Sequence, residues 1–192
     1  MGRRAYFKHG DFIEAAIRLI AEQGLGALTI SALSRRVKSP VGSVYHRFLS
    51  RDALLAELWL TIVESFQKEF LKKLKRDGLQ AALYGLQWVK EHPNEGRVLL
   101  LYRREDIASG KWPIDLQKRA QNLTKEMDEG IRLFTQQQFG RVTRETIDRT
   151  LFVLRDAPGG IIRRYLEYNK IPPESVCELI RETYVAVMKK VK

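Results

Sequence analysis

A group of polar side chains between residues 29 and 51 has the chemistry needed to contact nucleic acid. Four of its members lie within five positions of one another: Ser43, Tyr45, His46 and Arg47. Hydroxyl and guanidinium groups donate hydrogen bonds to phosphate oxygens and to the edges of bases. The backbone beside Gly42 can approach a phosphate closely, because glycine has no side chain. These residues predict a surface that touches DNA.

Two short helices are expected to position this surface. Thr29 can cap the first helix and Ser39 the second, since a short side-chain oxygen accepts a hydrogen bond from a free N–H of the first turn. Pro40 then falls at the first helical position, where its missing N–H costs nothing. Apolar residues recur at spacings of three and four, at Ile30, Leu33 and Val37 and again at Val44 and Phe48. The pattern predicts a helix-turn-helix with its second helix at 41–48.

On these residues, positions 9–52 resemble the amino-terminal domain of the TetR/AcrR transcriptional regulators. That family has a first helix ending in Gly, then Thr-x-x-x-Ile/Leu-Ala, a turn, Gly-Thr/Ser-Leu/Val-Tyr-x-x-Phe and Ser-Lys/Arg-Glu/Asp-x-Leu. The matching elements here are Gly24 and residues 29–34, 42–48 and 50–54. The family's turn usually reads Ala-Gly-Val-Ser, whereas here Lys38 takes the left-handed position that glycine normally serves.

The resemblance implies a DNA-binding domain at 1–51 and a larger helical domain at 52–192 that binds a small-molecule effector and dimerises. We expect phosphate contacts from Ser43, Tyr45 and Arg51, where Arg51 matches the family's Lys. Base contacts are expected from Ser31, Val41, Gly42 and Arg47. Thr29 and His46 complete the expected interface, although His46 could equally be an exposed histidine without a contact.

Positive charge gathers around the same segment. The net charge is +11, and residues 1–51 hold nine Lys and Arg against three Asp and Glu. Such an excess suits a surface that displaces counterions from a phosphate backbone. Arg3 and Arg4 precede the first helix and could form an arm that reaches DNA. The alternative is a charged terminus that binds nothing.

The remainder of the chain predicts an all-α fold of about nine helices. Amphipathic segments follow one another from Ser50, and no alternating pattern of a strand is strong enough to suggest a sheet. Residues 143–169 form one such segment, in which Pro158 and two glycines are expected to kink or break the helix. By resemblance, residues 143–169 and about 173–190 would pair with their copies in a homodimer. A two-fold dimer also reads two half-sites instead of one.

Aromatic residues of the helical domain could wall a pocket for the effector. The candidates are Trp88, Tyr102, Trp112, Phe134 and Phe152. Arg103, Arg104, Asp106 or Gln138 could add polar contacts, giving the mixture usual in small-molecule cavities. The alternative is that these aromatic residues are ordinary core.

Other classes of protein are less consistent with the sequence. His9, His46 and His92 lie far apart without partners at metal-ligand spacing, so we expect neither a metal nor a cofactor. No Gly-rich phosphate loop or recognisable catalytic constellation occurs, so we expect no enzyme. The single cysteine, Cys177, fits a reducing compartment. No apolar run reaches the length of a membrane span, and no signal peptide is evident.

The combined expectation is a cytoplasmic, homodimeric transcriptional regulator that binds a near-palindromic DNA operator. A ligand-responsive repressor is the favoured form. The alternative function is a basic helical interaction or architectural protein that senses no effector.

Overall fold

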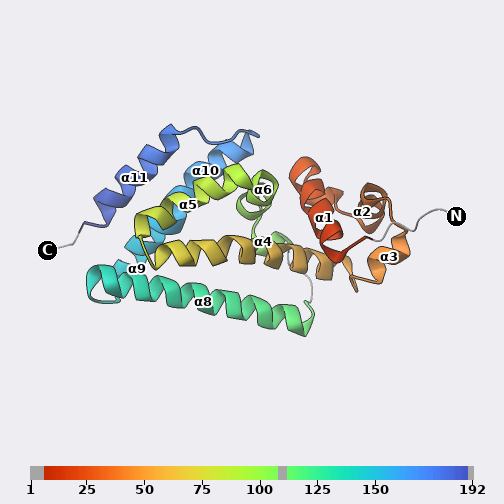
Figure 1. Ribbon diagram of the computed structural model, residues 1–192, viewed down its shortest axis with the longest axis horizontal. Coiled ribbons are helices and arrows are strands. Elements are labelled where there is room, and N and C mark those ends of the chain that lie inside the picture. The colour runs from red at the N-terminus through yellow and green to blue at the C-terminus, as the bar shows by residue number, and fades with distance from the viewer. Residues whose placement is uncertain (1–6, 108–111, 190–192) are drawn as a thin grey trace.

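The computed structural model describes residues 7–107 and 112–189, and every regular element in these ranges is helical (Figure 1). This confirms the all-α fold class, and the number of helices is close to the prediction. The elements are α1 (His9–Gln23), η1 (Leu25–Ala27), α2 (Ile30–Val37), α3 (Val41–Tyr45), α4 (Arg51–Leu74), α5 (Gly78–Glu91), α6 (Pro93–Leu101), α7 (Arg104–Ile107), α8 (Ile114–Phe139), α9 (Arg144–Leu151), η2 (Phe152–Asp156), α10 (Ala157–Glu167) and α11 (Ser175–Val187).

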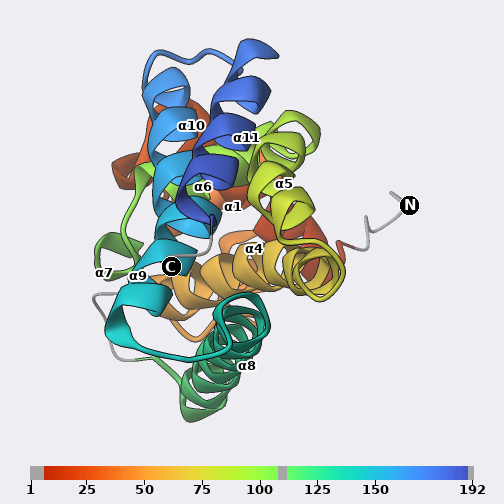
Figure 2. The same cartoon turned by 90° about the vertical axis from the view of Figure 1, so that its left-hand side faces the viewer.

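The helix α4 is the axis that joins the two ends of the molecule. It begins beside α1–α3 and runs along the rest of the chain, with α8 on one side and α5 on the other (Figures 1 and 2). Its first turn is capped by the hydroxyl of Ser50, which accepts a hydrogen bond from the N–H of Ala53 at 3.0 Å. An ion pair between Glu64 and Arg119 holds α8 against it. Displacement of α4 would therefore reach both ends of the molecule.

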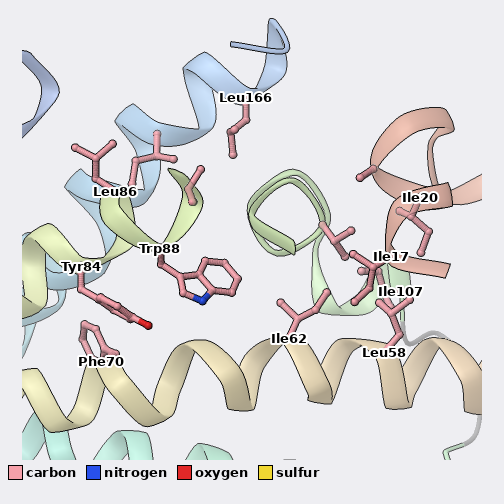
Figure 3. Close-up of a cluster of buried hydrophobic side chains, with 14 of the residues drawn as sticks. Ile17, Ile20, Leu58, Ile62, Phe70, Tyr84, Leu86, Trp88, Ile107 and Leu166 are labelled. Atoms are coloured by element: carbon pink, nitrogen blue, oxygen red, sulfur yellow. The ribbon is translucent and has the colours of Figure 1, made fainter. Parts of the chain in front are cut away.

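The larger of two clusters of buried apolar side chains among the described residues continues from α1 into the helical domain. Ile17 of α1 lies beside Leu58 of α4 and Ile107 of α7 (Figure 3). Further from α1, the same core includes Phe70 of α4 and Trp88 of α5. All five of these residues are buried. The core thus crosses the boundary that the sequence predicts between residues 51 and 52.

The expected break near Pro158 is not a break. α9, η2 and α10 form one helical run from Arg144 to Glu167, and η2 is a π-helical turn directly before α10. Proline cannot donate the hydrogen bond that an α-helix needs at this position. The wider π turn accommodates the irregularity without ending the helix.

Candidate nucleic-acid interface and effector cavity

The turn between α2 and α3 has the predicted geometry. The hydroxyl of Thr29 caps α2 by accepting a hydrogen bond from the N–H of Ala32 at 3.1 Å. Lys38 adopts φ 56° and ψ 41°, the left-handed conformation expected from the comparison of turn residues. The N–H of Ser39 donates to the carbonyl of Ser34 at 3.0 Å, and the hydroxyl of Ser34 donates to the carbonyl of Ser39. These two bonds fix the angle between the helices.

The second helix is shorter than predicted and is capped differently. α3 ends at Tyr45, three residues before Phe48, so that His46 and Arg47 lie in a turn. The sequence predicts Ser39 as the cap of α3, but Pro40 stands at the N-cap without a side-chain bond. The physical reason is that Ser39 is buried in the turn, where its hydroxyl faces the carbonyl of Pro40 at 3.5 Å.

Several predicted contact residues are exposed on this domain. They are Thr29, Ser31, Val41, Gly42, Tyr45 and His46, whereas Ser43 is half-buried. A Cβ atom added to Gly42 would have no neighbour within 4 Å, so open space adjoins the backbone there. Beneath them, Leu33 and Val44 are fully buried in the domain core. The helices are therefore held by their apolar faces while these polar and small residues remain accessible.

Arg47 does not lie on the outward face predicted for it. Its Nη1 donates to the carbonyl of Ser43 at 2.9 Å, and its Nη2 donates to the carbonyl of Phe7 at 2.8 Å. Its guanidinium also lies 4.9 Å from the centre of the Phe12 ring. Because α3 ends at Tyr45, the side chain of Arg47 turns into the domain. There it ties the segment before α1 to the second helix.

Arg51 likewise binds the backbone of its own domain. Its Nε donates to the carbonyl of Leu28 at 2.7 Å, and its Nη2 donates to the carbonyl of Leu25 at 3.2 Å. These bonds orient the guanidinium and leave its Nη1 group for another acceptor, since arginine has five N–H donors. Arg3 and Arg4 lie outside the described residues.

A cavity of about 370 Å³ lies in the helical domain, between α4, α5, α6, α8, η2 and α10. Its apolar lining includes Trp59, Phe66, Phe70, Trp88, Leu99, Leu100, Met127, Ile131, Pro158 and Ile162. Asp128 and Arg155 supply charge, and Arg155 is paired with Asp156 at 2.7 Å. Among the described residues, no acceptor binds the buried Nε1–H of Trp88, which projects from α5 towards α4 (Figure 3).

Of the five aromatic residues predicted to wall the pocket, only Trp88 lines this cavity. Trp112 lines a separate groove beside Arg104, whose guanidinium lies 5.3 Å from its ring centre. Phe134 is buried, Tyr102 is half-buried, and neither lines the cavity. Phe152 is 45% exposed and faces an outer groove beside Val187. Trp88, Phe134 and Phe152 come from different helical elements, and Tyr102 and Trp112 lie in the connections beside α6 and α8. The sequence does not reveal how these segments are turned relative to one another.

Most of the cavity lining, including Phe66 and Phe70, is not predicted from the sequence. These two residues stand four positions apart on α4, and their rings stack with centres 5.6 Å apart. Their spacing predicts a core stripe, which is the commoner meaning of such a pattern. The signal that could have indicated a cavity is the gathering of Trp59, Phe66 and Phe70 on a single helix.

Burial raises the pKa of three groups in the helical domain. Burial, together with the nearby Glu174, raises the pKa of the Cys177 thiol, which disfavours the nucleophilic thiolate. Burial also raises the pKa of Tyr84 and, to about 12, that of Tyr184. Within residues 7–107 and 112–189, no cluster of His, Cys, Asp and Glu could hold a metal ion. No helix in these ranges is both long and apolar enough to cross a membrane.

Comparison with known proteins extends this description. Residues 12–58 match the family model of bacterial regulatory proteins of the tetR family. A search of curated protein sequences finds no significant match.

Solved structures of transcriptional regulators, several of them described as tetR family proteins, share the fold of almost the whole chain. A tetR family protein from Shewanella sp. PV-4 aligns with a TM-score of 0.71 at 17% identity, over 95% of this chain and 96% of that chain. The transcriptional regulator FadR from Bacillus subtilis, in complex with stearoyl-CoA, aligns with a TM-score of 0.68 at 11% identity, over 96% and 100%. PfmR from Thermus thermophilus aligns with a TM-score of 0.65 at 15% identity, over 98% and 99%. The resemblance inferred from the sequence is thereby confirmed, by the family model for the amino-terminal segment and by these structures for the fold.

Proposed function

We propose that this chain, which has the fold of a TetR-family transcription regulator, is a ligand-responsive repressor that binds a near-palindromic operator as a homodimer. The observation that carries the proposal is the helix-turn-helix. Thr29 caps its first helix, Lys38 forms the left-handed turn, and open space adjoins the backbone at Gly42. A DNA-bound regulator acts where the DNA is, so the proposal includes a cytoplasmic location. Turnover of a substrate plays no part in it.

The position of Arg47 changes which residues we expect to contact bases and which we expect to contact phosphates. Since its guanidinium binds Ser43 and Phe7, we assign Arg47 to holding α3 in place. Reading of bases then rests on Ser31, Val41 and the backbone at Gly42. Phosphate contacts remain with Ser43, Tyr45 and Arg51, assisted by Thr29 and His46.

Two copies would place their α3 helices in successive major grooves, about 34 to 36 Å apart or somewhat wider. The proposed dimer surface is formed by the run from α9 to α10 together with α11. Exposed apolar side chains there support this assignment: Phe152 is 45% exposed, and Leu179 and Val185 are each 50% exposed. Burial of such side chains against a second copy would favour association.

The cavity is the proposed effector site. Its lining is mostly apolar, so we expect a mostly apolar effector, with a hydrogen-bond acceptor for the Nε1–H of Trp88. The stearoyl-CoA complex of the structurally similar FadR supports an apolar ligand in a fold of this kind.

The helix α4 offers a mechanical link between effector and DNA. It begins at Arg51, beside α3, and its residues Phe66 and Phe70 line the cavity. An effector that prefers the arrangement unable to bind DNA would shift the population towards it. A ligand with equal affinity for both arrangements would shift nothing.

Selection of bound DNA from a random pool, at two salt concentrations, tests the proposal. We expect enrichment of an inverted repeat, whose half-site spacing reports the distance between the two α3 helices. Binding that depends on salt but enriches no sequence would contradict it and favour the basic architectural protein instead. Sedimentation of the same protein with and without the selected DNA would test the dimer.

A further inference from the structure

Arg97 of α6 connects three parts of the chain that are far apart in sequence. Its Nε donates to the carbonyl of Ala21 in the last turn of α1, at 3.0 Å. Its Nη1 donates to the carbonyl of Leu166, at 2.9 Å, and to the side-chain oxygen of Asn169, also at 2.9 Å. One guanidinium therefore spans the DNA-binding end of the molecule and the end of α10.

These acceptors are suited to a cation. The last carbonyls of a helix lack an N–H partner within the helix and carry the negative end of its dipole. Ala21 lies in the last turn of α1, and Leu166 lies next to the last residue of α10. Asn169 follows in the left-handed conformation, with φ 56°, which turns the chain at the end of α10. Arg97 thus binds the ends of two helices at once.

A second arginine also joins α6 and α10, but here the donor is on α10 and the acceptor is on α6. Nε of Arg163, on α10, donates to the carbonyl of Leu100, on α6, at 2.7 Å. Leu100 lines the cavity, as do Pro158 and Ile162 of α10. α6 lies between α1 and α10 (Figure 1). A ligand that displaces the walls of the cavity therefore moves α6 and α10, the two helices that Arg97 joins.

We propose that Arg97 is a positioning residue that couples the occupancy of the cavity to the placement of α1, and through α1 to the DNA-binding surface. This inference rests on the proposed function. Movement of α6 relative to α10 changes the position of the guanidinium. The bond from Nε to Ala21 then transmits that change to α1, against which the helix-turn-helix packs.

The test measures coupling instead of activity. The affinity of the chain for 1-anilinonaphthalene-8-sulfonate, a fluorescent probe with an apolar ring system, is determined with and without the selected DNA. The ratio of the two affinities is the coupling factor, and reciprocity requires the probe to change the affinity for DNA by the same factor. Loss of probe binding in Gly85→Leu, which fills the cavity from α5, verifies that the probe occupies this site.

We expect a coupling factor of at least about fivefold in the unsubstituted chain and below about twofold in Arg97→Gln. Binding of the probe alone and of DNA alone should persist in this variant. Asn169→Gly removes one acceptor and retains the left-handed backbone, so it should fold and show an intermediate factor. Arg76→Gln makes the same change of charge at an exposed position just beyond the end of α4 and should leave the factor unchanged.

An undiminished factor in both Arg97→Gln and Asn169→Gly would overturn the inference while leaving the proposed function intact. Absence of coupling in the unsubstituted chain would also overturn it, because Arg97 would then have nothing to transmit. Failure of the DNA selection itself identifies a failure of the proposed function.

Discussion

The side chains enclosed by α1, α2 and α3 fill their domain, whereas those between α4, α5 and α10 leave a space of about 370 Å³. Phe12, Leu33 and Val44 are fully buried in the first region. In the second, aromatic rings such as Phe66 face the cavity on one side. A filled core holds a surface rigid for an external partner, and a hollow core provides room for an internal one. The contrast teaches that closely packed side chains lie beneath the proposed DNA-binding surface, whereas the unfilled space lies where the effector site is proposed.

The largest expected effect is on the filled region. Phe48→Ala should lower the free energy of unfolding by about 3 to 5 kcal/mol, because it removes a fully buried ring from a closely packed site. Phe66→Ala should cost roughly half as much or less, since that ring already lacks neighbours on the cavity side. Urea denaturation of both variants measures the difference. Equal losses would break the comparison.

Substitution of two glycines of α5 is expected to give the next largest change in stability. Gly78 lies in a closely packed part of the helical domain, and Gly85 lies beside the cavity. A Cβ atom at Gly78 would overlap the ring of Phe134 and the hydroxyl of Tyr184, so Gly78→Ala should cost about 1 to 3 kcal/mol. At Gly85 the nearest atom, on Ile162, would be 3.6 Å away. Gly85→Ala should therefore stabilise the helix by about 0.5 to 1 kcal/mol. The midpoint temperature of thermal unfolding should fall in Gly78→Ala and rise in Gly85→Ala. Shifts of the same sign would contradict the view that only Gly78 is closely packed.

A glycine on the DNA-binding domain tests the surface without disturbing the core. Gly42→Ala should leave stability unchanged or slightly raised, because open space adjoins this position. The added methyl group should nevertheless hold the α3 backbone away from DNA and weaken binding about tenfold, or about 1.4 kcal/mol. Titration of the selected DNA measures the loss, with Gly85→Ala as the matched control. Unchanged affinity would show that the backbone at Gly42 does not approach DNA.

The smallest effect concerns the packing of α11. Burial, and to a lesser extent the charge of Asp77, raises the pKa of Tyr184 from 10.0 to about 12. The folded chain therefore holds this proton more tightly than the unfolded chain. The resulting stabilisation is fully present below pH 10 and is lost as the pH rises from 10 towards 12. Tyr184→Phe should remove this loss, as measured by urea denaturation at several pH values. An identical pH dependence in the variant would show that the packing of α11 does not bury the hydroxyl of Tyr184.

Local chemistry makes the helix-turn-helix predictable. Capping by Thr29 depends on neighbours within a few residues and follows from the sequence, and the left-handed turn at Lys38 follows from the resemblance to the family's turn. The inward position of Arg47 does not, because it depends on where α3 ends and on Phe7, forty residues earlier. The match to the family pattern at 42–48 gives no sign of that early end.

The cavity and the contacts of Arg97 depend on partners distant in the chain. Arg97 binds Ala21, which is 76 residues away, through a carbonyl that every residue type possesses. No pattern of side chains in the sequence marks such an acceptor. The sequence leaves open whether Trp88 and Phe134 wall a pocket or are ordinary core, and both are buried. It does not predict which of them meets empty space.

The π turn before Pro158 determines which side chains of α10 face the cavity. Successive residues of an α-helix are rotated by about 100° around its axis. If residues 152–156 formed an ordinary α-helical turn with no residue removed, the following helix would rotate by about that angle relative to α9, because a π turn takes one residue more than an α turn. Ile162 would then leave the cavity and Arg163 would leave Leu100. The shape of the cavity and the hydrogen bond from Arg163 to Leu100 thus both depend on the length of one helical turn.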